Sequence, residues 1–184
     1  MKSNLNTITK GVSYLLTGLG IDWKHDKNFI ETPKRVARAM VELNDGLYNP
    51  YERFTSFPST YNGIIFFKSI KATALCPHHL MPIEYDISFA YIPNGTVLGL
   101  SKIPRIIKNL CQRPVLQEDL TNDIVKKFAD KLQPKGIAIE VRGIHGCMKF
   151  RGIQEAEIVK TAQLYGLFLT APQTREEFYN LITK

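Results

Sequence analysis

The chain has 184 residues, an apolar share of 44% and a formal net charge of +7 at neutral pH. This length suits one domain, and the apolar share is sufficient for a core without disulfide bonds. No run of about 18 apolar residues occurs, so we expect no membrane association. The first residues lack a basic head followed by an apolar run, so we predict no signal peptide and a cytoplasmic location.

The positive charge and the odd number of cysteines each exclude one class of protein. The lysines and arginines are scattered, and aromatic residues do not alternate with a basic stripe. A nucleic-acid partner is therefore not expected, and the favoured explanation of the charge is scattered basic residues, some of which bind a small anionic substrate. Three cysteines in a chain without an export signal argue against a disulfide framework and leave metal binding or burial.

Hydrophobic spacing predicts two helices at the start of the chain. Residues 4–18 carry apolar side chains at helical intervals. After a polar loop over 20–30, Thr32 is predicted as the N-cap of a second helix, with Pro33 as its first residue. This helix is expected to end at Asn44-Asp45-Gly46.

Strand and helix signals then arrive in pairs. The pattern predicts strands over 64–75 and 83–92, a short helix from Ser101 to about residue 111, a helix over 118–132, strands over 137–141 and 156–169, and a helix over 173–182. Paired strands indicate an antiparallel α+β fold and not a parallel sheet. We expect one domain over 1–184, with a helical part at 1–50 and a catalytic part at 60–184.

Cysteine and histidine gather in two short windows, each just after a predicted strand: Cys76-Pro77-His78-His79 and His145-Gly146-Cys147. A C-x-x-H spacing can place Cys76 and His79 on one zinc ion, and Cys147 would add a third ligand. Three protein ligands leave one position for water, which is the catalytic pattern.

The two remaining histidines, His78 and His145, would flank that metal and could move protons near neutral pH. A closed structural zinc site stays open as an alternative, because His145 could supply a fourth ligand. Cys111 falls within a predicted helix, where we expect it to be a buried small hydrophobic residue.

Further short motifs occur in order over residues 30–178. They are Glu31-Thr32-Pro33-Lys34-Arg35-Val36-Ala37, Ala90-Tyr91-Ile92-Pro93, Gly99-Leu100-Ser101-Lys102 with Arg105, Arg113-Pro114 through Gln117-Glu118 to Leu120-Thr121, Cys147-Met148 and Arg151-Gly152-Ile153. Each fragment is weak alone, but the ordered set is specific. Together with the two metal windows, it resembles the GTP cyclohydrolase I family.

The resemblance implies a fold, an assembly and a reaction. The fold would be the tunnelling fold, an antiparallel four-stranded sheet with helices on one face and extra N-terminal helices. The assembly would be a toroidal homodecamer with sites between neighbouring subunits. The reaction would be the zinc-dependent conversion of GTP to 7,8-dihydroneopterin triphosphate and formate, the first step of pterin and folate-type biosynthesis.

The resemblance also implies a role for each matching residue. The Zn²⁺ ligands would be Cys76, His79 and Cys147. His78 and His145 would be catalytic, and Ser101 would assist the later rearrangement. Glu118 would recognise the guanine, and Gln117 would add a polar contact. The residues that bind the triphosphate would be Arg35, Arg38, Lys102, Arg105 and Arg151.

Elementary chemistry is compatible with these roles. No G-x-x-x-x-G-K-[ST] phosphate loop is present, so a triphosphate would need cationic side chains. Lys102 and Arg105 are three residues apart, on one helical face, although a solvated face is the alternative for such a pair. Glu118 could accept two hydrogen bonds from guanine, whereas adenine lacks that pair of donors.

Two departures from the family pattern keep an alternative open. Pro77 stands where the family usually has glutamate, and at residues 157–161 only Thr161 fits its serine- and threonine-rich strand. The alternative is a non-catalytic zinc-binding paralogue of the same fold. A zinc deaminase would need H-x-E and P-C-x-x-C motifs, which are absent. A nitrile reductase of the same fold would need no zinc, and a basic nucleic-acid-binding protein would show steep salt dependence.

Overall fold

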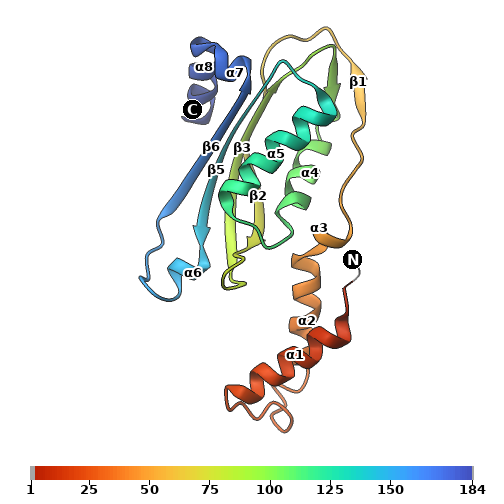
Figure 1. Cartoon of the computed structure of the whole chain (residues 1–184), viewed down its shortest axis with the longest axis vertical. Helices are drawn as coiled ribbons and strands as arrows, with labels where there is room; N and C mark the ends of the chain where they lie inside the picture. The colour runs from red at the N-terminus through yellow and green to blue at the C-terminus, as the bar shows by residue number, and fades with distance from the viewer. Residues whose placement is uncertain (1–2, 184) are drawn as a thin grey trace.

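The computed structural model describes residues 3–183, and its centre is one antiparallel sheet (Figure 1). Its order is β2–β3–β5–β6, and every neighbouring pair is antiparallel. The strands are β2 (Ile65–Leu75), β3 (Pro82–Ile92), β5 (Gly136–His145) and β6 (Ile158–Gly166). The predicted α+β fold with a four-stranded antiparallel sheet is confirmed.

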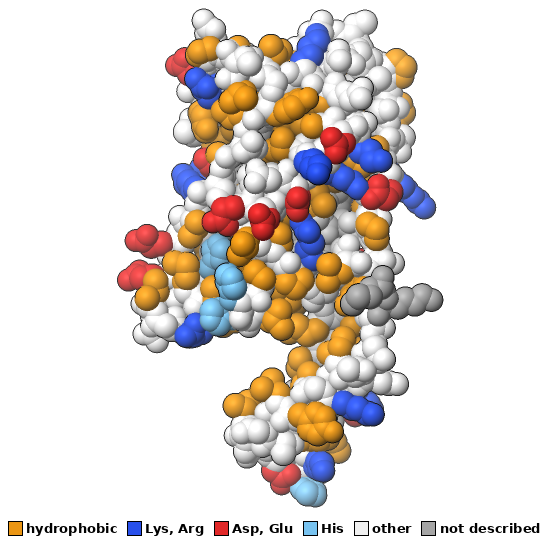
Figure 2. All heavy atoms as spheres, viewed as in Figure 1, with side chains coloured by type: hydrophobic (Ala, Val, Ile, Leu, Met, Phe, Trp, Pro, Cys, Tyr) orange, Lys and Arg blue, Asp and Glu red, His pale blue; other side chains and the backbone are white. Residues whose placement is uncertain are grey.

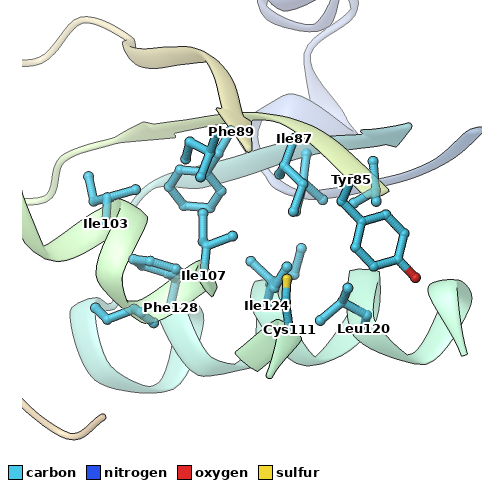
Figure 3. Packing of buried hydrophobic residues seen from close by; sticks show 14 of the residues in the cluster. Tyr85, Ile87, Phe89, Ile103, Ile107, Cys111, Leu120, Ile124 and Phe128 are labelled. Carbon is cyan, nitrogen blue, oxygen red and sulfur yellow. The ribbon is translucent and has the colours of Figure 1, made fainter. Parts of the chain in front are cut away.

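Two long helices, α4 (Lys102–Cys111) and α5 (Gln117–Leu132), cover one face of this sheet (Figure 1). Successive strand residues point to opposite faces, so alternate residues of β3 enter the core between sheet and helices. The closely packed side chains in Figure 3 include Tyr85, Ile87, Phe89, Ile103, Ile107, Cys111, Leu120, Ile124 and Phe128. Cys111 is fully buried there, as expected from its place in the sequence.

The opposite face of the sheet is covered at one end only. There α7 (Leu167–Thr170) and α8 (Pro172–Thr183) pack Phe168 and Phe178 against Ala90 and Ala138. The long helices thus share one face, as predicted, and the C-terminal helix adds a cap on the other. Beyond that cap the second face carries Lys71, Glu84, Asp86, Glu140, Arg142 and Lys160, and includes the ion pair of Lys71 with Asp86 at 2.8 Å.

The N-terminal helices α1 (Leu5–Gly18), α2 (Thr32–Leu43) and α3 (Asp45–Tyr48) extend beyond one end of the sheet (Figure 1). The prediction of Thr32 as the N-cap is wrong by one residue. The Thr32 amide donates to the Phe29 carbonyl at 2.9 Å, so the backbone already turns before Thr32, and Glu31 becomes the N-cap. Pro33 lies in the first turn, where it costs no helical hydrogen bond.

The remaining differences concern short elements and boundaries. β1 (Ser56–Pro58) pairs with β4 (Thr96–Leu98), and neither three-residue strand is long enough to show periodicity in the sequence. β5 continues to His145 and leads into α6 (Gly146–Lys149). β6 ends at Gly166, whose φ of +59° starts α7. Among the described residues, no helix is long and apolar enough to cross a membrane.

Candidate active site

The two cysteine- and histidine-containing windows meet at one end of the sheet. β2 ends just before Cys76, β5 ends at His145, and β3 lies between them with Ile83 opposite His145. One ligand atom from each of Cys76, His79 and Cys147 lies within 4.8 Å of the other two. The structure therefore brings together the three residues predicted as metal ligands, and these three form what we call the metal corner.

A tight turn holds the first window in place. The Leu80 amide donates to the Cys76 carbonyl at 2.8 Å, and the Cys76 amide donates to the Met81 carbonyl at 2.9 Å. Leu80 adopts a φ of +53°, which a branched side chain rarely does and which costs about 1 kcal/mol or more. The hydrogen bonds across the turn hold this conformation and fix the direction of His78 and His79.

The donor set of the metal corner fits zinc. Cys76 Sγ lies 4.0 Å from Nδ1 of His79 and 3.9 Å from Nδ1 of His78. Burial, followed by the neighbouring Cys76 thiol, raises the pKa of Cys147. A divalent cation between the two sulfurs would reverse that effect, because its charge favours both thiolates. Cys76 is buried and His79 is exposed, so one side of the corner opens to solvent.

His145 lies beside the metal corner without being needed as a ligand. Its Nε2 is 2.9 Å from Oε1 of Gln117, the first residue of α5. The ring of Tyr85 meets it edge to face, with ring centroids 6.5 Å apart. Burial lowers the pKa of His145, and the nearby Glu118 carboxylate opposes this only in part. Burial thus favours the neutral ring, which can accept a proton.

The start of α5 supplies the residues predicted to read the base. Glu118 is exposed on the first turn, where the helix dipole favours a carboxylate, and it makes no ion pair among residues 3–183. It lines a shallow depression together with Thr121, Asn122 and Thr161. Gln117 is only 2% exposed, and both ends of its amide are hydrogen-bonded within the chain.

The predicted cationic residues are dispersed over the chain. Arg151 reaches the metal corner, with Nη1 2.9 Å from Nε2 of His79. Ser101, Lys102 and Arg105 instead lie at the N-terminal end of α4, where the Lys102 amide donates to the Gly99 carbonyl beside β4. The opposite end of α4 leads to Arg113, whose carbonyl accepts from the Leu75 amide next to Cys76.

The ten residues of α4 rise about 15 Å in total. Lys102 and the metal corner of the same chain are therefore separated by the length of this helix. Arg35 and Arg38 are exposed on α2, outside the sheet and its helices. One chain by itself holds the candidate chemistry but leaves most of the predicted phosphate-binding residues elsewhere.

Sequence reasoning did not single out Tyr85, a residue of β3 whose ring contacts His145. Its hydroxyl is buried without a hydrogen-bond partner among the described residues, and burial raises its pKa. Tyr85 pairs with Gly143 on β5, and a Cβ at Gly143 would lie 2.8 Å from a carbon of the Tyr85 ring. A tyrosine in a buried strand facing a glycine was a usable signal, but only once the strand register was known.

Histidine side chains gather on the surface at this end of the sheet, with hydrophobic side chains around them (Figure 2). Three protein ligands on a corner that opens to solvent on one side leave a coordination position for water, which is the pattern of a catalytic and not of a structural zinc site. The fold and the site thus define an antiparallel α+β protein with a candidate catalytic metal centre.

Comparison with known proteins gives the particular family. The family model of GTP cyclohydrolase I matches residues 8–183, and the chain belongs to that family. It is 38% identical to GTP cyclohydrolase 1 of Sulfurihydrogenibium sp. over 178 residues, 96% of this chain and 94% of the relative. It is 34% identical to GTP cyclohydrolase 1 of Rhodopirellula baltica over 180 residues, 96% of this chain and 78% of the relative.

Family membership confirms the predicted enzyme class and the tunnelling fold that the resemblance implied. Among solved structures, the chain is similar to the archaeosine synthase QueF-Like in the apo form. The TM-score is 0.43 at 20% sequence identity, and the match covers 59% of this chain and 96% of that one.

Proposed function

We propose that this chain hydrolyses GTP to 7,8-dihydroneopterin triphosphate and formate, with Zn²⁺ held by Cys76, His79 and Cys147. The observation that carries the proposal is the metal corner, with its ligand atoms within 4.8 Å, in a chain of this family. His78 and His145 lie beside it as histidines that the three-ligand set does not need. In this role the protein acts in the cytoplasm at the start of pterin or folate-type biosynthesis.

Zinc, when bound, would act as a Lewis acid that activates water for attack on carbon 8 of the guanine. The chain's own residues then handle protons. His78, or His145 once its neutral ring has accepted a proton, donates a proton to nitrogen 7, which makes carbon 8 electrophilic and prepares opening of the imidazole ring of guanine. After formate leaves, Ser101 or His145 moves protons during the rearrangement of the ribose. Positioned acid–base groups of this kind contribute about a hundredfold to ten-thousandfold each.

Arg151 links the metal corner to the triphosphate in this proposal. A guanidinium only donates, so Nε2 of His79 accepts its hydrogen bond in the structure. If His79 bound zinc through Nδ1, its ring proton would be on Nε2. That N–H would then face the N–H groups of Arg151, and the hydrogen bond between them would be lost. Binding of the metal would therefore free Arg151 to contact the phosphates. The other predicted phosphate-binding residues, Arg35, Arg38, Lys102 and Arg105, would come to the same site from a neighbouring subunit.

Base recognition falls to Glu118. Its exposed carboxylate can accept one hydrogen bond from the ring N–H of guanine and one from its amino group. It lies on the first turn of α5, where the helix dipole favours a negative charge. Adenine would leave the carboxylate unpaired, which accounts for the choice of GTP.

The proposal includes a ring of subunits, a homodecamer, with each site shared between neighbours. Two features of the single chain support it. The predicted phosphate-binding residues at the start of α4 lie a helix length from the metal corner, so a neighbour must bring them there. The edge strands β2 and β6 have 11 and 9 residues, and such long open edges pair readily with another chain.

The experiment that tests this function is an assay of the zinc-loaded protein with GTP. Formate and dihydroneopterin triphosphate should both appear, and a sample stripped with chelator should form neither until zinc is restored. Tightly bound zinc without any formate would refute the proposed reaction. It would favour the non-catalytic paralogue. Pro77 and residues 157–161 would then be the first positions to replace with the residues usual in the family.

A further inference from the structure

The side-chain amide of Gln117 is buried in a complete set of hydrogen bonds. Its Nε2 lies 3.1 Å from the Val141 carbonyl oxygen, 3.0 Å from the Val159 carbonyl oxygen and 3.3 Å from Thr161 Oγ1. Its Oε1 lies 2.9 Å from Nε2 of His145. These contacts join α5 to β5 and β6, and they account for the 2% exposure of the residue.

The two backbone carbonyls determine which way the amide faces. A carbonyl oxygen accepts and never donates, so the group facing Val141 and Val159 must be the NH₂ of Gln117. The flipped amide would set its own oxygen against two oxygens with no proton between them, in a buried place where this is costly. Oε1 therefore faces His145, and it can only accept from that ring.

The neighbouring hydroxyls fit the same assignment. Thr121 Oγ1 donates to the Gln117 backbone carbonyl at 2.7 Å, so its lone pairs are free to accept from Thr161 Oγ1, also at 2.7 Å. Thr161 has then given its own proton to Thr121, and its oxygen can accept from Gln117 Nε2. The two protons of the NH₂ group are thus shared among three acceptors, and all three contacts require the same orientation of the amide.

We propose that Gln117 is a positioning residue that fixes His145 as the Nε2–H tautomer and so commits Nδ1 to proton exchange with the substrate. Nδ1 has no hydrogen-bond partner among residues 3–183, and Tyr85 limits rotation of the ring from the side. This inference rests on the proposed function for its catalytic meaning. It gives Gln117 a role different from the expected polar contact to the base.

The tautomer itself is measured without any assay of activity. The sequence has four histidines, so zinc-loaded protein with ¹⁵N-labelled histidine rings can be sedimented and studied by solid-state NMR, whatever its assembly size. At about pH 8, above the ordinary histidine pKa of about 6.5, the ring is neutral. The His145 signal of the wild-type protein is assigned as the one that is missing in His145→Asn. It should show a protonated Nε2 and an unprotonated Nδ1. A proton on Nδ1, or an equal mixture, overturns the inference.

The catalytic meaning is tested with Gln117→Met, which keeps the length of the side chain and removes both hydrogen-bonding ends. We expect a mixture of His145 tautomers and a fall in kcat of about tenfold to a hundredfold, with KM for GTP within about twofold. Gln173→Met, on the exposed surface of α8, is the matched control and should change neither quantity.

A rise in KM with unchanged kcat in Gln117→Met would assign Gln117 to substrate binding and overturn the positioning role. Failure of the proposed function looks different. In that case the wild-type protein forms no formate from GTP, while the His145 signal still reports the Nε2–H tautomer.

Discussion

The two ends of α4 differ in how much of the candidate site one chain holds there. Near its C-terminal end, strand pairing gathers three ligand atoms within 4.8 Å and sets His145 against Gln117. At its N-terminal end, about 15 Å along the helix, Lys102 Nζ lies 3.3 Å from the Tyr51 hydroxyl, and Lys102 forms no ion pair among residues 3–183. The candidate metal ligands are thus brought together within one chain, whereas the predicted phosphate-binding residues of α4 lie a helix length away from them.

The largest expected effect comes from breaking the metal corner. Cys147→Ala should lose bound zinc and reduce formate release by more than about a thousandfold, because both the Lewis acid and its water disappear. Metal analysis alongside the assay checks this. Cys111→Ala, which removes a buried cysteine outside the candidate ligand set, should keep its zinc. A metal-replete Cys147→Ala protein would remove Cys147 from the ligand set.

His145→Ala should separate proton transfer from metal binding at the same end. We expect turnover to fall by about a hundredfold to ten-thousandfold, because the ring that exchanges protons with the substrate is gone. Zinc content should stay at the wild-type level, since Cys76, His79 and Cys147 remain. Wild-type turnover in this variant would exclude His145 from the chemistry.

The distant end of α4 is tested by complementation between chains. Arg105→Ala should raise KM for GTP by about tenfold, because a charge-assisted contact to phosphate is lost. Mixed rings of Arg105→Ala and Cys147→Ala chains should regain sites in which both residues are intact, so activity at low GTP should exceed that of either variant. If native mass spectrometry shows mixed rings without this gain, each site lies within one chain.

Gly143→Ala tests how closely the metal end is packed. The new Cβ would lie 2.3 Å from Gln117 Oε1 and 2.8 Å from the Tyr85 ring, so one of them must move. We expect a loss of about 1–3 kcal/mol in the free energy of unfolding by urea. Gly11→Ala, in α1 with nothing within 4 Å of its Cβ, is the control and should be neutral or stabilising. Equal stability of the two variants would contradict the close packing.

The smallest effect concerns the thiol that takes no part in the site. Burial raises the pKa of Cys111 to about 12, and its side chain is inaccessible. In chelator-treated protein, a thiol reagent should modify Cys147 in the native state and Cys111 only on unfolding. Mass spectrometry of labelled peptides checks this order, and early modification of Cys111 would show that the core near α4 opens readily.

Much of the fold follows from local pattern. The alternation over 83–92 predicted β3, which begins one residue earlier at Pro82, because side chains of a strand change face at every residue. The helical spacing over 118–132 predicted α5, which begins one residue earlier at Gln117. β1 and β4 were missed because three residues carry no period, and their pairing joins distant parts of the chain.

The sequence by itself determined which residues form the metal corner, since their types and short spacings already indicated zinc, and it determined the family through ordered motifs. Only the tertiary structure decided that Gln117 faces His145 and not solvent, and that α4 separates Lys102 from the metal corner. The physical reason is that composition and spacing report on neighbours along the chain. Strand register and amide orientation are instead set by hydrogen bonds between segments that are far apart in the sequence.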